Sequence, residues 1–175
     1  MVDDTKVAAA VAEPADVAAA SLETIFRVHY ARLVALARIL LDRQADAEEV
    51  VQEAFARVMA RRGAGDARIA YVERAVVNLC RDGLRRRAVI RRISEVAPAE
   101  VRAAEQIALG TAEQRRVLAA VRDLPRRQRE CVALRHLLGH STEEAAVVLG
   151  ISEGSVKTHL HRGMAALETE LEDWR

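Results

Sequence analysis

The sequence predicts an all-α fold of two small helical domains, a helical bundle and a helix-turn-helix domain, joined by a flexible linker. Apolar residues recur at helical spacing along most of the 175 residues. Turn formers are scarce, with 8 glycines and 3 prolines, which argues against an all-β fold. A stretch with weak periodicity, containing Pro98 and Gly110, separates two groups of helical patterns. These observations divide the chain into two domains.

The first domain is expected over residues 22–92, after a tail of residues 1–21. The tail is rich in alanine, valine and acids without a clear apolar face, so we expect it to be disordered. Ser21 can cap the first helix, and Asp46 can cap the second. A basic, glycine-containing loop precedes the third. The expected helices of this domain span about residues 22–41, 46–59 and 67–87, the last running to Arg87 or beyond.

The second domain is expected over residues 114–175, after an acidic linker of residues 93–113. Pro125 suits the first turn of a helix, and Ser141 with Glu144 matches a capping box. Gly150 stands where the chain must turn between two helices, and Ser152 can cap the last one. The expected helices here span about residues 112–122, 126–138, 143–149 and 153–172.

The last two helices have the layout of a helix-turn-helix. Val156 and Leu160 predict one buried face of the second helix, and small polar and basic side chains occupy its exposed start. Such side chains suit the major groove of DNA, where hydroxyls and Lys reach base edges or phosphates. The alternative is an ordinary helical hairpin with a polar surface.

The formal net charge of +1 conceals strong segregation. Residues 57–92 carry eleven Arg against Asp66, Glu73 and Asp82, a net charge of +8. Such a block could bind a polyanion, or it could simply be a solvated helical surface. Tyr71 is the aromatic residue in this block, so it is a candidate for stacking on unpaired bases, with a role at the edge of the core as the alternative.

Several classes of function are not supported by the residues. Cys80 and Cys131 occupy apolar helix positions and are expected to be buried rather than redox-active. The five histidines show no zinc-ligand spacing with cysteine, and no catalytic arrangement is evident. We therefore expect no metal, no cofactor and no enzymatic activity. Apolar runs are too short for a membrane helix, and a cytoplasmic location is expected.

Two segments of the first domain carry a family resemblance. The first is DAEEVVQEAF, residues 46–55, which begins with acidic residues and ends in the pattern VQE-x-F. The second is a run of spaced residues before the triplet Arg85-Arg86-Arg87, made up of Tyr71, Arg74, Asn78 and Asp82. The second domain carries further matching residues in the order that the same family shows: Leu124-Pro125, Gln128-Arg129, Glu144-Ala-Ala, Gly150 and Ser155-Val-Lys-Thr. Over residues 22–92 and 114–171 the chain resembles RNA polymerase sigma factors of the sigma-70 family, extracytoplasmic-function (ECF) subgroup. Tyr71 departs from the usual Trp.

The resemblance implies three sets of site residues. Contact with core polymerase is expected from Asp46, Glu49, Gln52 and Glu53 in region 2. Recognition of the minus-ten element is expected from Arg61, Arg62, Arg68, Tyr71, Arg74, Asn78, Arg81 and Arg85, with the loop 62–67 beside a flipped-out base. Recognition of the minus-thirty-five element is expected from Ser155, Lys157, Thr158, His159 and Arg162 in region 4.

The resemblance also implies the function and the partners. The expected function is to bind core RNA polymerase, direct it to specific promoters and assist promoter melting. The partners would be the polymerase β′ coiled coil and β subunit, duplex and melted promoter DNA, and an anti-sigma factor, without membrane insertion. Two alternatives stay open: a stand-alone LuxR-like helix-turn-helix regulator, and a helical adaptor that binds no nucleic acid.

Overall fold

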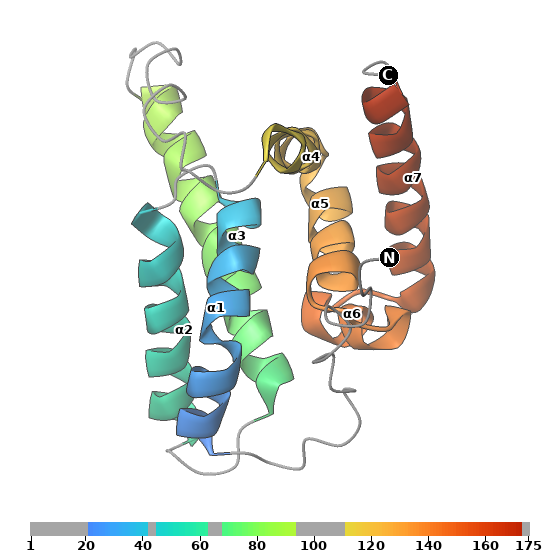
Figure 1. Ribbon diagram of the computed structural model, residues 1–175. Coiled ribbons are helices and arrows are strands. Elements are labelled where there is room, and N and C mark those ends of the chain that lie inside the picture. Colours follow the sequence, from blue (N-terminus) through green and yellow to red (C-terminus); the bar gives the residue numbers. More distant parts are fainter. Residues whose placement is uncertain (1–20, 42–44, 63–67, 94–110, 173–175) are drawn as a thin grey trace, which may run out of the picture.

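The computed structural model describes residues 21–41, 45–62, 68–93 and 111–172, and the regular structure within these ranges is helical throughout (Figure 1). The predicted all-α class is confirmed. Almost all of the predicted tail and most of the predicted linker lie outside the described residues, as does the loop 63–67. None of the described helices is both long and apolar enough to cross a bilayer.

Three helices form the first half of the molecule: α1 (Leu22–Leu40), α2 (Ala45–Arg62) and α3 (Ile69–Ile93), which pack as a bundle (Figure 1). Ser21 caps α1 as predicted, because its side chain accepts a hydrogen bond from the Thr24 backbone. The prediction that Asp46 caps α2 is wrong, because the helix begins one residue before Asp46. The helix starts at Ala45, so Asp46 lies in its first turn, where the helix dipole still favours a carboxylate.

The second half contains α4 (Ala112–Asp123), α5 (Arg126–Val132), the π-helical turn η1 (Ala133–Leu137), α6 (Thr142–Leu149) and α7 (Glu153–Glu172). The single helix predicted over residues 126–138 is thus an α-helix that widens into a π-helical turn. The Leu138 backbone donates to the Ala133 carbonyl, five residues back, at 3.3 Å. Apolar spacing alone does not distinguish this wider turn from a continuing α-helix.

Local chemistry explains the helix-turn-helix formed by α6 and α7. Ser141 and Glu144 form the predicted capping box at the start of α6. Gly150 ends that helix at φ +66°, a left-handed conformation that glycine adopts readily. Ser152 then accepts a hydrogen bond from the Ser155 backbone in the first turn of α7, and Val156 is fully buried. These local contacts fix the start of α7 relative to α6.

The two halves share a hydrophobic core. One cluster of buried side chains contains Leu36 of α1 and Val76 of α3, and also Leu134 of η1 and Val148 of α6. Helix α1 packs against α4, α5 and η1, while α3 packs against α6. Each half is too small to bury much apolar surface alone, so this shared core adds burial to both.

Candidate nucleic-acid interface

The acidic start of α2 presents most of the residues that the sequence assigns to polymerase contact. Glu49, Gln52 and Glu53 are exposed on this helix, and Glu53 also pairs with Arg57 at 2.7 Å. Asp46 differs, because it is half-buried and pairs with Arg87 of α3. Three of the four predicted residues therefore form an accessible polar face. The fourth, Asp46, forms an ion pair that links α2 to α3.

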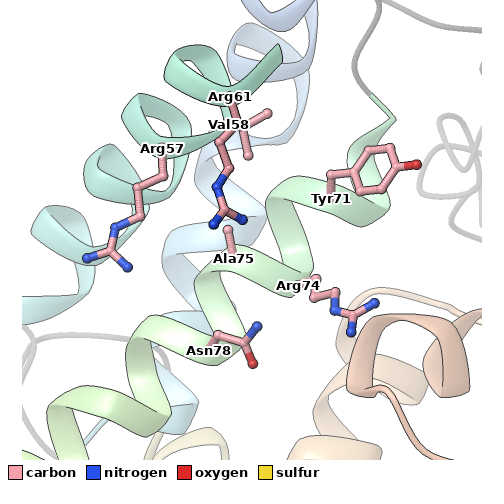
Figure 2. Close-up of a pocket in the computed structure, with 7 residues that line it drawn as sticks. All are labelled: Arg57, Val58, Arg61, Tyr71, Arg74, Ala75 and Asn78. Atoms are coloured by element: carbon pink, nitrogen blue, oxygen red, sulfur yellow. The ribbon is translucent and has the colours of Figure 1, made fainter.

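A basic hollow lies between α2 and α3 (Figure 2). It is lined by Arg57, Val58 and Arg61 of α2 and by Tyr71, Arg74, Ala75 and Asn78 of α3. The structure thus brings four predicted minus-ten residues together: Arg61, Tyr71, Arg74 and Asn78. Sequence reasoning missed Arg57, although its position one turn before Arg61 places the two guanidinium groups along one face of α2.

The hollow combines positive charge with an accessible aromatic ring. Tyr71 is 40% exposed at its rim, and Figure 2 shows the ring pointing away from α2. Arg74 points toward α6 in the same view, and its guanidinium lies 3.4 Å from the position that a Cβ on Gly150 would occupy. Guanidinium groups bind phosphates and an aromatic face stacks on bases, so the hollow has the chemistry to hold single-stranded nucleic acid.

The other predicted minus-ten residues lie in different surroundings. Arg68 is exposed immediately before α3, and Arg85 is exposed and pairs with Asp82. The side chain of Arg62 lies outside the described residues. Arg81 is only 13% exposed, because it reaches the second half of the molecule and pairs there with Glu130. The predicted set therefore divides between the hollow, its flanks and the contact between the halves.

The exposed side of α7 carries the residues predicted to read duplex DNA. At about 100° per residue, Thr158 lies nearly opposite the buried Val156. Arg162 and Lys157 lie about 120° and 100° from Val156 on its two sides, and His159 lies about 60° from it, at the edge of the buried side. Lys157, Thr158 and Arg162 are exposed, while Ser155 and His159 are partly buried. All five predicted residues thus belong to one broad polar face of the recognition helix.

The two cysteines are not reactive centres. Burial, with the nearby Glu130 carboxylate, raises the pKa of the Cys80 thiol to about 12 and that of the Cys131 thiol to about 11. Both thiols are therefore protonated near neutral pH, as expected of buried small hydrophobes. Among the residues that the structure describes, no group of three or more His, Cys, Asp or Glu side chains forms a candidate metal site.

Comparison with known proteins assigns both halves of the chain to regions of one protein family. A model described as Sigma-70 region 2 matches residues 25–89, and one described as Sigma-70, region 4 matches residues 114–167. The chain is 34% identical over 154 residues to the ECF RNA polymerase sigma factor SigM of Mycobacterium tuberculosis, covering 84% of this chain and 75% of the relative. It is 36% identical over 132 residues to the RNA polymerase sigma-E factor of Streptomyces antibioticus, covering 73% and 71%.

Two solved structures share the fold. The sigma factor RpoE, crystallised with the anti-sigma factor NepR from Bartonella quintana, has a TM-score of 0.75 at 23% identity, covering 87% of this chain and 98% of that one. CnrH, in complex with the cytosolic domain of CnrY, has a TM-score of 0.64 at 25% identity, covering 87% and 88%. With both sigma-70 regions matched in order and ECF sigma factors among its relatives, the chain belongs to the ECF group of the sigma-70 family of RNA polymerase sigma factors.

Proposed function

We propose that this chain is a dissociable initiation subunit that binds core RNA polymerase, directs it to specific promoters and assists promoter melting, without catalysing a covalent reaction. The observation that carries the proposal is the presence, in one chain, of a basic hollow in region 2 and a helix-turn-helix in region 4. A stand-alone regulator would need only the second of these. Its place of action would be the cytoplasm, where polymerase and chromosome meet.

Contact with the polymerase is assigned to the exposed acidic face of α2. Glu49, Gln52 and Glu53 offer carboxylates and an amide on neighbouring helical positions. A basic or polar partner helix could pair with this face, which suits the β′ coiled coil that the family resemblance implies. Asp46 acts indirectly in this assignment, by holding the start of α2 against α3 through Arg87.

The basic hollow is assigned to the melted minus-ten element. Arg57, Arg61 and Arg74 would neutralise phosphates. Asn78 Oδ1 accepts from Arg81 Nη1 at 3.3 Å, so Asn78 would offer its amide NH₂ group to a base edge. Tyr71 would stack on an unpaired base at the boundary between duplex and single strand. Capture of unstacked bases shifts the equilibrium toward the melted state, which is how binding assists melting.

The polar face of α7 is assigned to the minus-thirty-five element. Thr158 would face the groove, with the exposed Lys157 and Arg162 nearer the backbones on either side and the partly buried His159 at the edge of this face. An anti-sigma factor is a further proposed partner, because two relatives in fold were solved as complexes, RpoE with an anti-sigma factor and CnrH with a domain of CnrY.

Two binding measurements test this proposal against its alternatives. Purified chain mixed with core polymerase is expected to co-elute with it in gel filtration, and to confer tight binding to promoter duplexes that core lacks. A stand-alone regulator would instead bind duplex DNA without core, with an affinity that falls steeply as salt rises. A helical adaptor would bind no DNA in either setting. Failure to bind core refutes the proposal.

A further inference from the structure

We propose that base reading by α7 is centred on a stripe of three exposed residues, Gly154, Thr158 and His161, and that His161 is a specificity-determining residue for duplex DNA. The stripe differs from the residues that the sequence assigns to this helix, which include Ser155 and His159 but neither Gly154 nor His161. The inference rests on the proposed function, because it concerns the helix to which recognition of the minus-thirty-five element is assigned.

The three residues of the stripe lie on the side of α7 that faces away from the core. At about 100° per residue, Gly154 and Thr158 lie about 160° from the buried Val156, on its two sides, and His161 lies about 140° from it. All three residues are exposed. With a rise of about 1.5 Å per residue, the stripe is about 10 Å long, so it can meet about three base pairs stacked about 3.4 Å apart.

Gly154 allows the start of α7 to approach a partner closely. It is the second residue of the helix, and a Cβ added there would have no atom within 4 Å. Packing within the described part of the chain therefore does not require a glycine at this position. A helix without a side chain at this point brings its backbone nearer to base edges, and the first residues of a recognition helix are those that enter the groove.

Thr158 presents an oxygen acceptor and a methyl group rather than a hydroxyl donor. Its Oγ1 donates to the Gly154 carbonyl at 2.9 Å, one turn earlier in α7. The hydroxyl hydrogen is therefore engaged within the helix, while lone pairs of the oxygen stay available. In the major groove, guanine offers only acceptors, whereas adenine and cytosine offer amino groups and thymine a methyl group. Thr158 therefore discriminates against guanine on the strand that it contacts.

His161 supplies the donor that Thr158 lacks. It lies three residues further along the same side of α7, and it forms no hydrogen bond or ion pair with the other residues that the structure describes. An imidazole carries at least one N–H donor whether it is neutral or charged. That donor can pair with N7 or O6 of guanine or with O4 of thymine, so His161 can distinguish bases that Thr158 does not.

Cations flank the stripe on both sides. Lys157 lies about 100° from Val156 on one side and Arg162 about 120° from it on the other, and both are exposed. Phosphates border the major groove on both sides, so two flanking cations would orient α7 with the stripe toward the bases. Neutral side chains between two cations therefore divide the helix face into base-reading and phosphate-binding parts.

Two residues that the sequence assigns to this helix face lie outside the stripe. The Ser155 backbone donates to Ser152 Oγ at 3.2 Å, and the two hydroxyl oxygens lie 2.9 Å apart, so Ser155 is engaged at the start of the helix. His159 is partly buried and lies about 60° from Val156, toward the core. Both residues would support the position of α7 rather than read bases.

The base preferences of the holoenzyme test the role of His161. Core polymerase carrying the full chain is used to select promoter duplexes, and each base pair of the upstream element is then replaced in turn. For a direct contact, we expect the preferred base pair to bind about tenfold more tightly than its replacement. His161→Ala should reduce that ratio to about one at one or two adjacent base pairs and leave the preferences elsewhere unchanged.

Two further histidine variants are the matched comparisons. His136→Ala removes an exposed imidazole from η1, outside the helix-turn-helix, and should leave all affinities unchanged. His159→Ala removes the partly buried imidazole of α7 and should keep every base preference, even where it lowers the affinity for all duplexes alike. Circular dichroism of each variant checks that its helices are retained.

Gly154→Ala tests the close approach independently. The added methyl group has room in the free chain, so the variant should keep its helices and its affinity for core polymerase. In the complex the methyl group would stand between the helix and the base edges. We therefore expect the affinity of the holoenzyme for its preferred duplex to fall by about tenfold, as for loss of one base contact.

The outcomes separate this inference from the proposed function. Unchanged base preferences in His161→Ala, or altered ones in His159→Ala, would overturn the inference, as would full affinity in Gly154→Ala. If the chain does not bind core polymerase, the proposed function fails, and the same selection with the chain alone still tests the stripe. An absence of sequence-dependent DNA binding in both settings would overturn both.

Discussion

Gln52 and Lys157 are exposed side chains on different halves, so they separate the two proposed binding roles. Gln52→Ala should weaken binding to core polymerase and leave the minus-thirty-five contact intact. Lys157→Ala should leave core binding intact, weaken promoter binding by the holoenzyme, and reduce the slope of log affinity against log salt by about one. Titrations of core and of promoter DNA measure both variants. Loss of DNA binding alone in both would contradict the division of roles.

His140 makes the stability of the folded chain depend on pH, because its Nε2 lies 2.9 Å from the buried Glu73 carboxylate of α3. Burial lowers the pKa of His140, but the hydrogen bond and charge of Glu73 outweigh burial, so the pKa is raised. Its contribution to stability is fully present below the ordinary histidine pKa of about 6.5 and is lost as pH rises through the raised value. The charged groups around it are Glu73, Glu144 and Arg32. We expect the free energy of unfolding, measured by chemical denaturation at a series of pH values, to fall over that range.

A control is required because His29 has the opposite dependence. Burial lowers the pKa of His29, so protonation of its imidazole destabilises the folded chain as pH falls. The pH response of His140→Gln, subtracted from that of the unsubstituted chain, isolates the His140 contribution. An unchanged response in this variant would rule out His140 as the titrating group.

At the scale of the elements, the contact between α5 and α7 depends on a glycine. A Cβ on Gly163 would lie 3.0 Å from Val132 Cγ2 and 3.3 Å from Gln128 Cβ. Gly163→Ala should therefore lower the free energy of unfolding by about 1 kcal/mol, because crowding exceeds the gain in helix propensity. Gly154→Ala in the same helix meets no atom within 4 Å and should raise stability by about 0.5 kcal/mol. Chemical denaturation followed by circular dichroism compares them, and equal effects would contradict this packing.

Local chemistry made several helix boundaries predictable. Ser21, the Ser141–Glu144 capping box and Gly150 act within a few residues of themselves, so their roles follow from sequence spacing. The π-helical turn at Ala133–Leu137 was not predictable, because its apolar residues fit an α-helix equally well. Element type is thus set locally here, whereas the hydrogen-bond pattern within an element also depends on what it packs against.

At the scale of the whole molecule, the basic block of residues 57–92 serves several purposes. Sequence alone suggests one polyanion-binding surface, but its arginines have different neighbours. Arg57, Arg61 and Arg74 line the hollow, Arg81 pairs with Glu130, and Arg87 pairs with Asp46. The partner of Arg81 is 49 residues away in the chain, so only tertiary packing reveals the pair. The basic block was therefore predictable as a set, and its division between the hollow and the contact between the halves was not.

The shared core was not predictable either, because it also depends on contacts between residues far apart in the chain. Each half was predicted as a separate domain from its own apolar stripes, which show that a face is buried but not against which partner. In the structure α1 and α3 bury part of their surface against η1 and α6. Separation of the halves would expose that surface, so the shared core stabilises each half.

Promoter-directed transcription is the most direct test of the central claim that the chain is an initiation factor. Core polymerase with the purified chain and genomic DNA of the source organism should produce transcripts with defined 5′ ends, preceded by two shared sequence elements at constant spacing. Core alone should not produce them. The same set of 5′ ends with and without the chain, in a reaction where core is active, would contradict the claim.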